Sequence, residues 1–163
     1  MSKLKPLVFL LISVAAFQNI KAQSLKNRDT MTIEQNKQIV IKFNNEFFAK
    51  GNTAITKELL ADTFINHTAP PNAPTDANVM IQFITGFHKG FSNIVVQINE
   101  VFGEDDKVCL RKTISATHIG EFMGKKPTGK KVEMNVIEID ILKNGKITDH
   151  WSRNDFMQVV QHL

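Results

Sequence analysis

Near residue 94 the hydrophobic pattern of this chain changes from a helical period to a period of two. Before that point, apolar residues recur every three to four positions, which is typical of amphipathic helices. After it, apolar and polar residues alternate, which is typical of strands with one buried face. Helices followed by an antiparallel meander favour an α+β domain with helices on one face of a curved sheet.

The helical part divides into three predicted helices. Thr32 and Gln35 have the spacing of a capping box, and the apolar spacing that follows runs to a stop at Gly51. A short helix is expected over residues 53–60, and Asp76 can cap a third helix that ends near Gly90.

The second part predicts four strands joined by tight turns. Residues 103–106 and the pair Asn144-Gly145 are typical hairpin turns. A short helix should close the chain after Asp155. The strands are expected over residues 94–102, 107–121, 132–142 and 146–153.

The first 22 residues have the layout of a secretory signal peptide. Two lysines precede an apolar run over residues 7–17, and Ala22 supplies the small residue at the end. The run is shorter than the ~20 residues that span a bilayer, so we expect no stable membrane insertion after cleavage. The alternative is an uncleaved anchor. We therefore predict a signal peptide over 1–22, a flexible lead-in over 23–34, a domain over 35–163, and a periplasmic or secreted protein.

Charge and composition restrict the classes of partner and cofactor that the chain could bind. The chain has 20 basic and 16 acidic side chains, and removal of the three leader lysines leaves 17 against 16. No basic footprint for nucleic acid then remains. The five histidines are scattered, no phosphate-binding glycine loop occurs, and Cys109 is alone. We expect no metal, no cofactor, no disulfide and no nucleic-acid partner.

Alternation along the last two strands selects a candidate base. The isoleucines at 137, 139 and 141 suggest that their face is the inner one, and Glu133 and Asn135 continue it. On the next strand Asp149 shares a face with Ile147 and Trp151, so its carboxyl is predicted to lie in an apolar wall. Burial there would raise its pKa and suit it to acid/base chemistry. The alternative is a structural ion pair between Asp149 and Arg153.

For the strand over 107–121, the alternation does not decide which face is buried. Val108, Leu110 and Ile114 share one parity with His118, whereas Arg111 belongs to the other. We therefore count both Arg111 and His118 as candidates for binding a substrate. A hydrogen-bonded structural role is the alternative for His118.

Four segments together resemble the SnoaL-like polyketide cyclase, or ester cyclase, family. Residues 117–130 (THIGEFMGKKPTGK) resemble its T-H-x-G-x-x-x-G-x-x-P-T-G-[KR] pattern, and residues 142–151 (LKNGKITDHW) resemble its DGKIxEHW pattern, followed by Asp155. Residues 64–67 (FINH) are similar to its F-V-D-H segment, and residues 103–108 (GEDDKV) to its EGDxV turn.

This resemblance implies a cone-shaped α+β barrel of the nuclear-transport-factor-2-like superfamily. Its curved antiparallel sheet would carry three N-terminal helices on the concave face around a deep hydrophobic pocket, and the protein would be a homodimer. Characterised members close a polyketide ring by aldol condensation with an Asp and no cofactor. That role would fall to Asp149, assisted by Glu133 and Asn135. The residues expected to bind the substrate are His67, Arg111, His118, Trp151 and Arg153.

Three functions follow from these observations. The first is cofactor-free cyclisation or isomerisation of a small apolar carbonyl compound. The second is a binding domain of the same fold without catalysis. The third is a hydrolase of the epoxide type, for which Asp149, Arg153 and Asp155 would have to surround a water molecule.

Overall fold

The computed structural model describes residues 31–163, which form one compact unit. The predicted signal peptide over 1–22 and most of the predicted lead-in lie outside the described residues. Among the helices of the described part, none is both long and apolar enough to cross a bilayer.

Local sequence explains where the helices begin. The Thr32 hydroxyl accepts from the Gln35 N–H at 3.2 Å, which completes the predicted capping box, and Asp76 caps its helix through the Asn78 N–H at 3.0 Å. The first helix does not continue as an α-helix to Gly51 but widens into a π-helical segment. The helical elements are α2 (Ile33–Phe43), η1 (Asn44–Ala49), α3 (Ile55–Leu59), α4 (Ala77–Gly90) and α5 (Phe156–Gln161).

The sheet has five strands in the order β1-β5-β4-β3-β2. Four of them form the predicted antiparallel meander. The fifth, β1, was not predicted; it lies beside β5 and runs parallel to it. The strands are β1 (Leu60–Asn66), β2 (Phe91–Glu104), β3 (Lys107–His118), β4 (Lys131–Lys143) and β5 (Lys146–Asn154).

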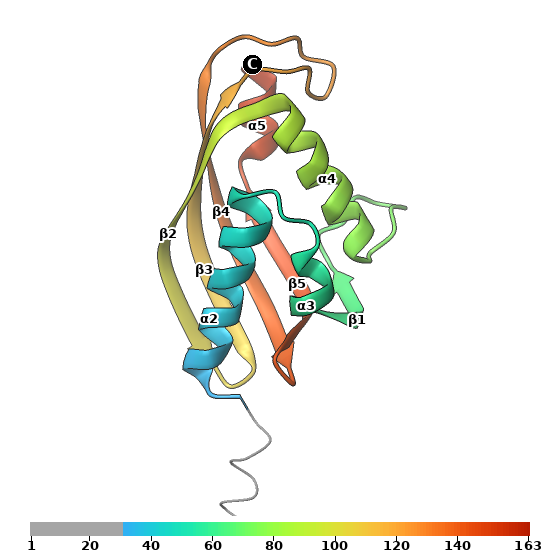
Figure 1. The fold of residues 1–163 in the computed structure, drawn as a ribbon, viewed down its shortest axis with the longest axis vertical. Coiled ribbons are helices and arrows are strands. Elements are labelled where there is room, and N and C mark those ends of the chain that lie inside the picture. Colours follow the sequence, from blue (N-terminus) through green and yellow to red (C-terminus); the bar gives the residue numbers. More distant parts are fainter. Residues whose placement is uncertain (1–30) are drawn as a thin grey trace, which may run out of the picture. The chain divides into compact units, whose positions relative to one another are not determined.

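The helices cover one face of this curved sheet, and the core lies between them (Figure 1). One cluster packs α2, η1 and α3 against β3 and the start of β5, with Phe47 and Ile147 fully buried. A second cluster packs α4 and α5 around Phe87, Phe91 and Phe122. This arrangement confirms the predicted α+β class; the sheet curves but remains unclosed.

The predicted inner face of β4 is wrong. The residues at 134, 136, 138, 140 and 142 are buried, whereas Ile137 and Ile139 are 51% and 42% exposed. Two acids, Glu138 and Asp140, therefore face the core, and three isoleucines face outward. Apolar content misled the prediction because the two acids have buried partners, which offset much of the cost of burying charge.

A bulge at Thr148 reverses the inner face along β5. Ile141 pairs with Asp149, but the next residue of β4 pairs with Ile147, so β5 holds one extra residue. Ile147 is buried on the concave side, whereas Asp149 is directed to the convex side and His150 to the concave one. The expectation that Ile147 and Asp149 share a face is therefore wrong.

Candidate functional site

A cavity of about 240 Å³ opens between the concave face of the sheet and the helices. Its apolar wall comes from η1, α4, α5 and the middle of β3 and β4, and Phe83 and Phe87 are the aromatic residues that α4 supplies. Its polar wall follows β1 and β5. The polar residues that line it are Asn66, Thr68, Lys112, Glu138, His150, Ser152 and Asn154.

A buried ion pair forms the floor of this cavity. Lys112 Nζ on β3 lies 2.6 Å from Glu138 Oε2 on β4, and both side chains are almost fully buried. Asn44, the first residue of the π-helical segment, donates from Nδ2 to Glu138 Oε1 at 2.6 Å and accepts from Lys112 Nζ. The Lys112 ammonium also lies 3.7 Å from the centre of the Phe48 ring. These contacts tie η1 to the sheet.

A second polar pair lies beside the first. His150 Nδ1 on β5 is 2.8 Å from Asp140 Oδ1 on β4, and the two residues are directly opposite in the antiparallel ladder. Asp140 Oδ2 is buried and has no partner among residues 31–163. Because Nδ1 is bonded to Asp140, Nε2 is the ring nitrogen left for the cavity that His150 lines.

The charges around this pair favour retention of one proton. Burial would lower the pKa of His150, but the charge and hydrogen bond of Asp140, together with the Glu138 charge, outweigh burial and raise it. Burial raises the pKa of Asp140, and the nearby Glu138 charge adds to that effect. Both pKa shifts reflect a single proton, which the Asp140–His150 pair retains to a higher pH than a free imidazole would.

Glu138 differs from Asp140 because it has a permanent cation beside it. Burial alone would raise the pKa of Glu138. The charges of Lys112 and His150 and the hydrogen bonds from Lys112 and Asn44 outweigh burial and lower it. Glu138 is therefore the ionised partner of Lys112, and Asp140 and His150 are the groups available for proton exchange.

Asp149 does not line the cavity. Its carboxylate lies on the convex side, 2.9 Å from His67 Nε2 and 2.8 Å from the Thr148 hydroxyl. The His67 hydrogen bond, opposed by partial burial and helped by Thr148, holds the pKa of Asp149 below its usual value. His67 in turn stacks on Trp151 with ring centres 4.0 Å apart. Within residues 31–163, Asp149 does not form the ion pair with Arg153 that we considered; its partner is His67.

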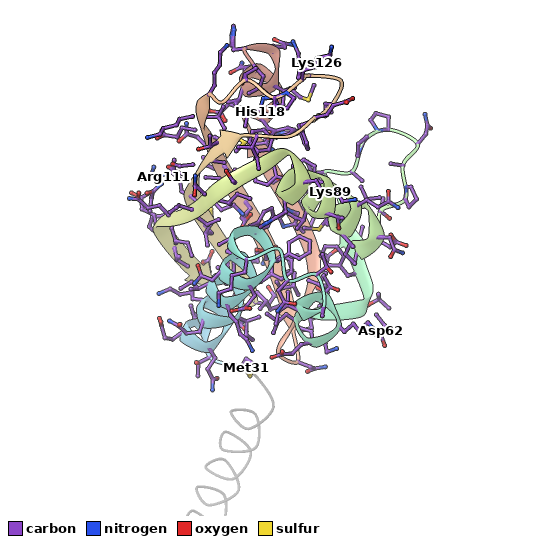
Figure 2. The ribbon with its side chains drawn as sticks, turned by 45° about the horizontal axis from the view of Figure 1, so that its top comes forward. Met31, Asp62, Lys89, Arg111, His118 and Lys126 are labelled. Carbon is purple, nitrogen blue, oxygen red and sulfur yellow. The ribbon has the colours of Figure 1, made fainter. Side chains whose placement is uncertain are left out.

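The other predicted site residues also lie outside the cavity. Glu133 and Asn135 are exposed, and Asn135 binds Asp155 through its backbone N–H at 2.8 Å. Arg111 is exposed on the sheet and pairs with Glu100 at 3.0 Å; Figure 2 shows it at the outer margin of the molecule. Arg153 is also exposed. The acid–Arg–acid set of an epoxide-type hydrolase is thus not assembled, because Asp149 and Asp155 have separate partners.

His118 is fully buried but belongs to a different part of the fold. Its Nδ1 lies 3.1 Å from the Thr128 hydroxyl, and its ring packs against Phe91. This contact fastens the loop after β3 to the end of the sheet. Figure 2 shows His118 at the same end of the domain as Lys126, which belongs to that loop. The structural role that we considered for His118 fits this position, and the residue does not line the cavity.

The residues that line the cavity floor were missed because the wrong face of β4 was followed. The tight turn at Asn144-Gly145 alone would place Asp140 opposite Asp149, and the extra residue at Thr148 moves the register by one so that Asp140 faces His150. The sequence therefore carried no local signal for this buried polar pair. Within residues 31–163, no group of three or more His, Cys, Asp or Glu side chains is placed to hold a metal ion.

Comparison with known proteins agrees with this architecture. The sequence profile described as "SnoaL-like polyketide cyclase" matches residues 38–163. No protein of curated function matches the chain. AclR of Streptomyces galilaeus is 24% identical with a TM-score of 0.71, and the match covers 80% of this chain and 96% of that one.

AclR is described as a hydroxylase, whereas two other solved structures carry the cyclase description. The SnoaL-like polyketide cyclase structure of Jannaschia sp. CCS1 is 21% identical, with a TM-score of 0.70 and coverage of 82% and 95%. The polyketide cyclase structure of Acidithiobacillus ferrooxidans is 23% identical, with a TM-score of 0.67 and coverage of 82% and 97%. At these identities the structures support a common fold.

Proposed function

Because the chain belongs to the SnoaL-like polyketide cyclase family, we propose that its concave cavity binds a small apolar carbonyl compound and promotes a cofactor-free aldol-type cyclisation or isomerisation. One observation carries this proposal. A His–Asp pair, His150 and Asp140, lies at an otherwise largely apolar cavity with Nε2 available to a ligand. In this proposal His150 takes the role that the sequence had suggested for Asp149.

The reaction needs one group that first accepts and then returns a proton. His150 Nε2 removes a proton from the carbon next to a carbonyl, and the electron pair of that C–H bond forms the enolate. The enolate carbon attacks a second carbonyl of the same molecule, and the resulting alkoxide takes the proton back from the imidazolium. Asp140 holds Nδ1–H and stabilises the imidazolium that forms.

The dimensions of the cavity favour a compact ligand. A volume of about 240 Å³ lies below the roughly 300–1,000 Å³ of pockets for drug-sized molecules. The aromatic side chains of α4 would cover the hydrocarbon part of such a ligand. Its oxygen atoms would then face the polar wall along β1 and β5.

Deuterium exchange into a small acyclic diketone in heavy water, followed by NMR, tests proton abstraction directly. The wild-type protein should accelerate exchange at the carbon next to the carbonyl. His150→Ala should lower that rate by about 10²- to 10⁴-fold, the usual contribution of a positioned general base. His162→Ala is the matched control, because His162 does not line the cavity.

The same experiment distinguishes the alternative function. If His150→Ala exchanges as fast as the wild type, the catalytic proposal fails. Retained ligand affinity in that case would favour the binding domain without catalysis. Native mass spectrometry for a co-purified ligand would identify the compound in either case.

We also propose that two copies associate through the convex face of the sheet. Four side chains form an outer row across β2, β3, β4 and β5, because each is paired with the next in the ladders. Phe102 is 60% exposed and Trp151 37% exposed, so this row presents an unusual amount of apolar surface. The outer row consists of Phe102, Cys109, Ile139 and Trp151.

Charges of both signs flank the outer row on the convex face. Arg111 and Arg153 lie on either side of Ile137, while Glu100 and Asp149 supply carboxylates on the same face. A second copy related by a two-fold axis could cover the apolar row and align opposite charges. Export to the periplasm or the medium remains a proposal that rests on the leader sequence.

A further inference from the structure

Asn66 lies beside His150 on the polar wall of the cavity. It is the last residue of β1, and its Cα is paired with that of His150 in the parallel β1–β5 ladder. Adjacent strands are about 4.8 Å apart, so the two side chains extend side by side from neighbouring strands. Both residues line the cavity.

The amide of Asn66 is held in one orientation. Its Oδ1 accepts from the Thr68 N–H at 2.9 Å, and its backbone N–H donates to the Thr75 carbonyl. The residue is only 7% exposed. Among residues 31–163, no hydrogen bond is formed by its Nδ2, so two N–H donors of a nearly buried amide remain available at the cavity.

We propose that Asn66 is a catalytic residue whose Nδ2 donates a hydrogen bond to the carbonyl oxygen of the substrate while His150 removes the neighbouring proton. This inference rests on the proposed function. It fixes the orientation of the ligand: the carbonyl oxygen is directed toward β1, the adjacent carbon toward β5, and the hydrocarbon remainder toward α4. The negative charge that develops on the enolate oxygen then meets a fixed donor in a site with little water.

A neutral amide suits this position better than an acid. Glu138 already lines the floor of the cavity beside Lys112, and Asp140 lies directly behind His150. A third carboxylate next to the forming enolate would oppose its charge. The amide supplies the donor without adding a charge.

A phenol probe tests this role without knowledge of the natural substrate. The anion of para-nitrophenol resembles an enolate, because it is planar and carries an oxyanion conjugated with its ring. Its absorbance band reports how much of the bound probe is ionised. Asn66→Asp keeps the acceptor for the Thr68 N–H but removes the donor, and Asn66→Ala removes both without introducing charge.

Both variants should bind the phenolate form about ten- to a hundredfold more weakly than the wild type, and a smaller share of the bound probe should be ionised. That range corresponds to the loss of one hydrogen bond to a charged acceptor. Asn66→Asp should have the lower phenolate affinity of the two variants, because its carboxylate also repels the anion. Asn99→Ala is the matched control, because Asn99 bonds to Thr113 and does not line the cavity. Deuterium exchange should be slower in both Asn66 variants, and the loss should appear as a lower kcat with little change in KM.

The outcomes separate the two proposals. Equal phenolate affinity and equal ionisation in the wild type and both Asn66 variants would overturn the role of Asn66 and leave that of His150 intact. Failure of the wild type to bind the probe at all would remove the proposed function, and the inference for Asn66 with it. Weaker phenolate binding in Asn66→Ala alone would also overturn it, because the aspartate lacks the donor as well.

Discussion

Asp149 and His150 are consecutive residues of β5, yet their side chains lie on opposite faces of the sheet. Asp149 contacts His67 on the convex side, and His150 contacts Asp140 at the cavity. Each histidine–carboxylate pair has a hydrogen bond of 2.8–2.9 Å, but burial raises the pKa of Asp140, whereas the His67 hydrogen bond lowers the pKa of Asp149. Only the pair at the cavity can meet a ligand held there.

The two carboxylates should therefore respond differently to the same substitution. Asp140→Asn should reduce deuterium exchange by about 10²-fold or more, because Asp140 orients the imidazole and stabilises its charged form. Asp149→Asn should change it by less than about threefold, since a position on the convex side makes no contact with the cavity. Rates of the two variants, measured side by side, check this contrast. A larger loss in Asp149→Asn would restore the role first suggested by the sequence.

The ionisation of His150 should occur above the ordinary value of 6.5. The Asp140 and Glu138 charges outweigh burial and raise the pKa of His150. As a general base His150 is active only when neutral, so exchange should increase as pH rises through this raised pKa. NMR titration of the imidazole resonances, in parallel with the pH–rate profile, measures both. Asp140→Asn should shift the titration to lower pH; an unchanged midpoint would contradict the pairing.

Removal of one partner of the buried ion pair should be costly. Lys112→Met leaves Glu138 and Asn44 without their cation, which typically costs about 3–5 kcal/mol of unfolding free energy. The double variant Lys112→Met/Glu138→Leu should recover much of that loss, because no buried charge is left unpaired. Urea unfolding followed by circular dichroism gives the three values. A Lys112→Met loss no greater than about 1 kcal/mol, the usual value for an exposed pair, would show that the pair is solvated.

Stability should be greatest in the window between the ordinary values of Glu and His. The folded protein lowers the pKa of Glu138, so this stabilisation is present above about 4.5 and is lost as pH falls through the lowered pKa. Folding also raises the pKa of His150. The stabilisation from His150 is therefore present below about 6.5 and is lost as pH rises through the raised pKa. Thermal unfolding across this range measures both limbs. In His150→Asn the alkaline limb should flatten while the acid limb remains.

The outer row should determine whether two copies associate. Ile139→Glu introduces charge at its centre and should convert the protein to a monomer in sedimentation or light-scattering measurements, with little effect on the fold. Thr117→Glu, on β3 beyond the outer row, is the control that should leave the assembly unchanged. A wild-type protein that sediments as a monomer would end this proposal.

The class of fold could be predicted because it depends on period and turn chemistry. The capping box at Thr32, the Asp76 cap and the Asn144-Gly145 turn each act within a few residues, and all three occur in the structure. The strand β1 was missed because it pairs with β5, which is far away in the chain. Such pairing leaves little trace in a short segment that ends in a proline-rich loop.

The site could not be predicted by the rule that apolar residues face inward. On β4 the acids are buried because Lys112 on β3 and His150 on β5 neutralise them. Lys112 is 26 residues from Glu138, and His150 faces Asp140 only because of the bulge. On β5 the extra residue at Thr148 shifts the alternation by one, and no residue type marks that position. The buried pairs that join β3, β4 and β5, and the bulge on β5, exist only once the sheet has assembled.

The stacking of Trp151 on His67 has a practical consequence for anyone who screens ligands. Trp151 is the only tryptophan, and it lies on the opposite side of the sheet from the cavity. Its intrinsic emission would therefore report the proposed contact between two copies, while a compound that fills the cavity would leave the emission almost unchanged. An assay of occupancy needs a chromophore on the ligand.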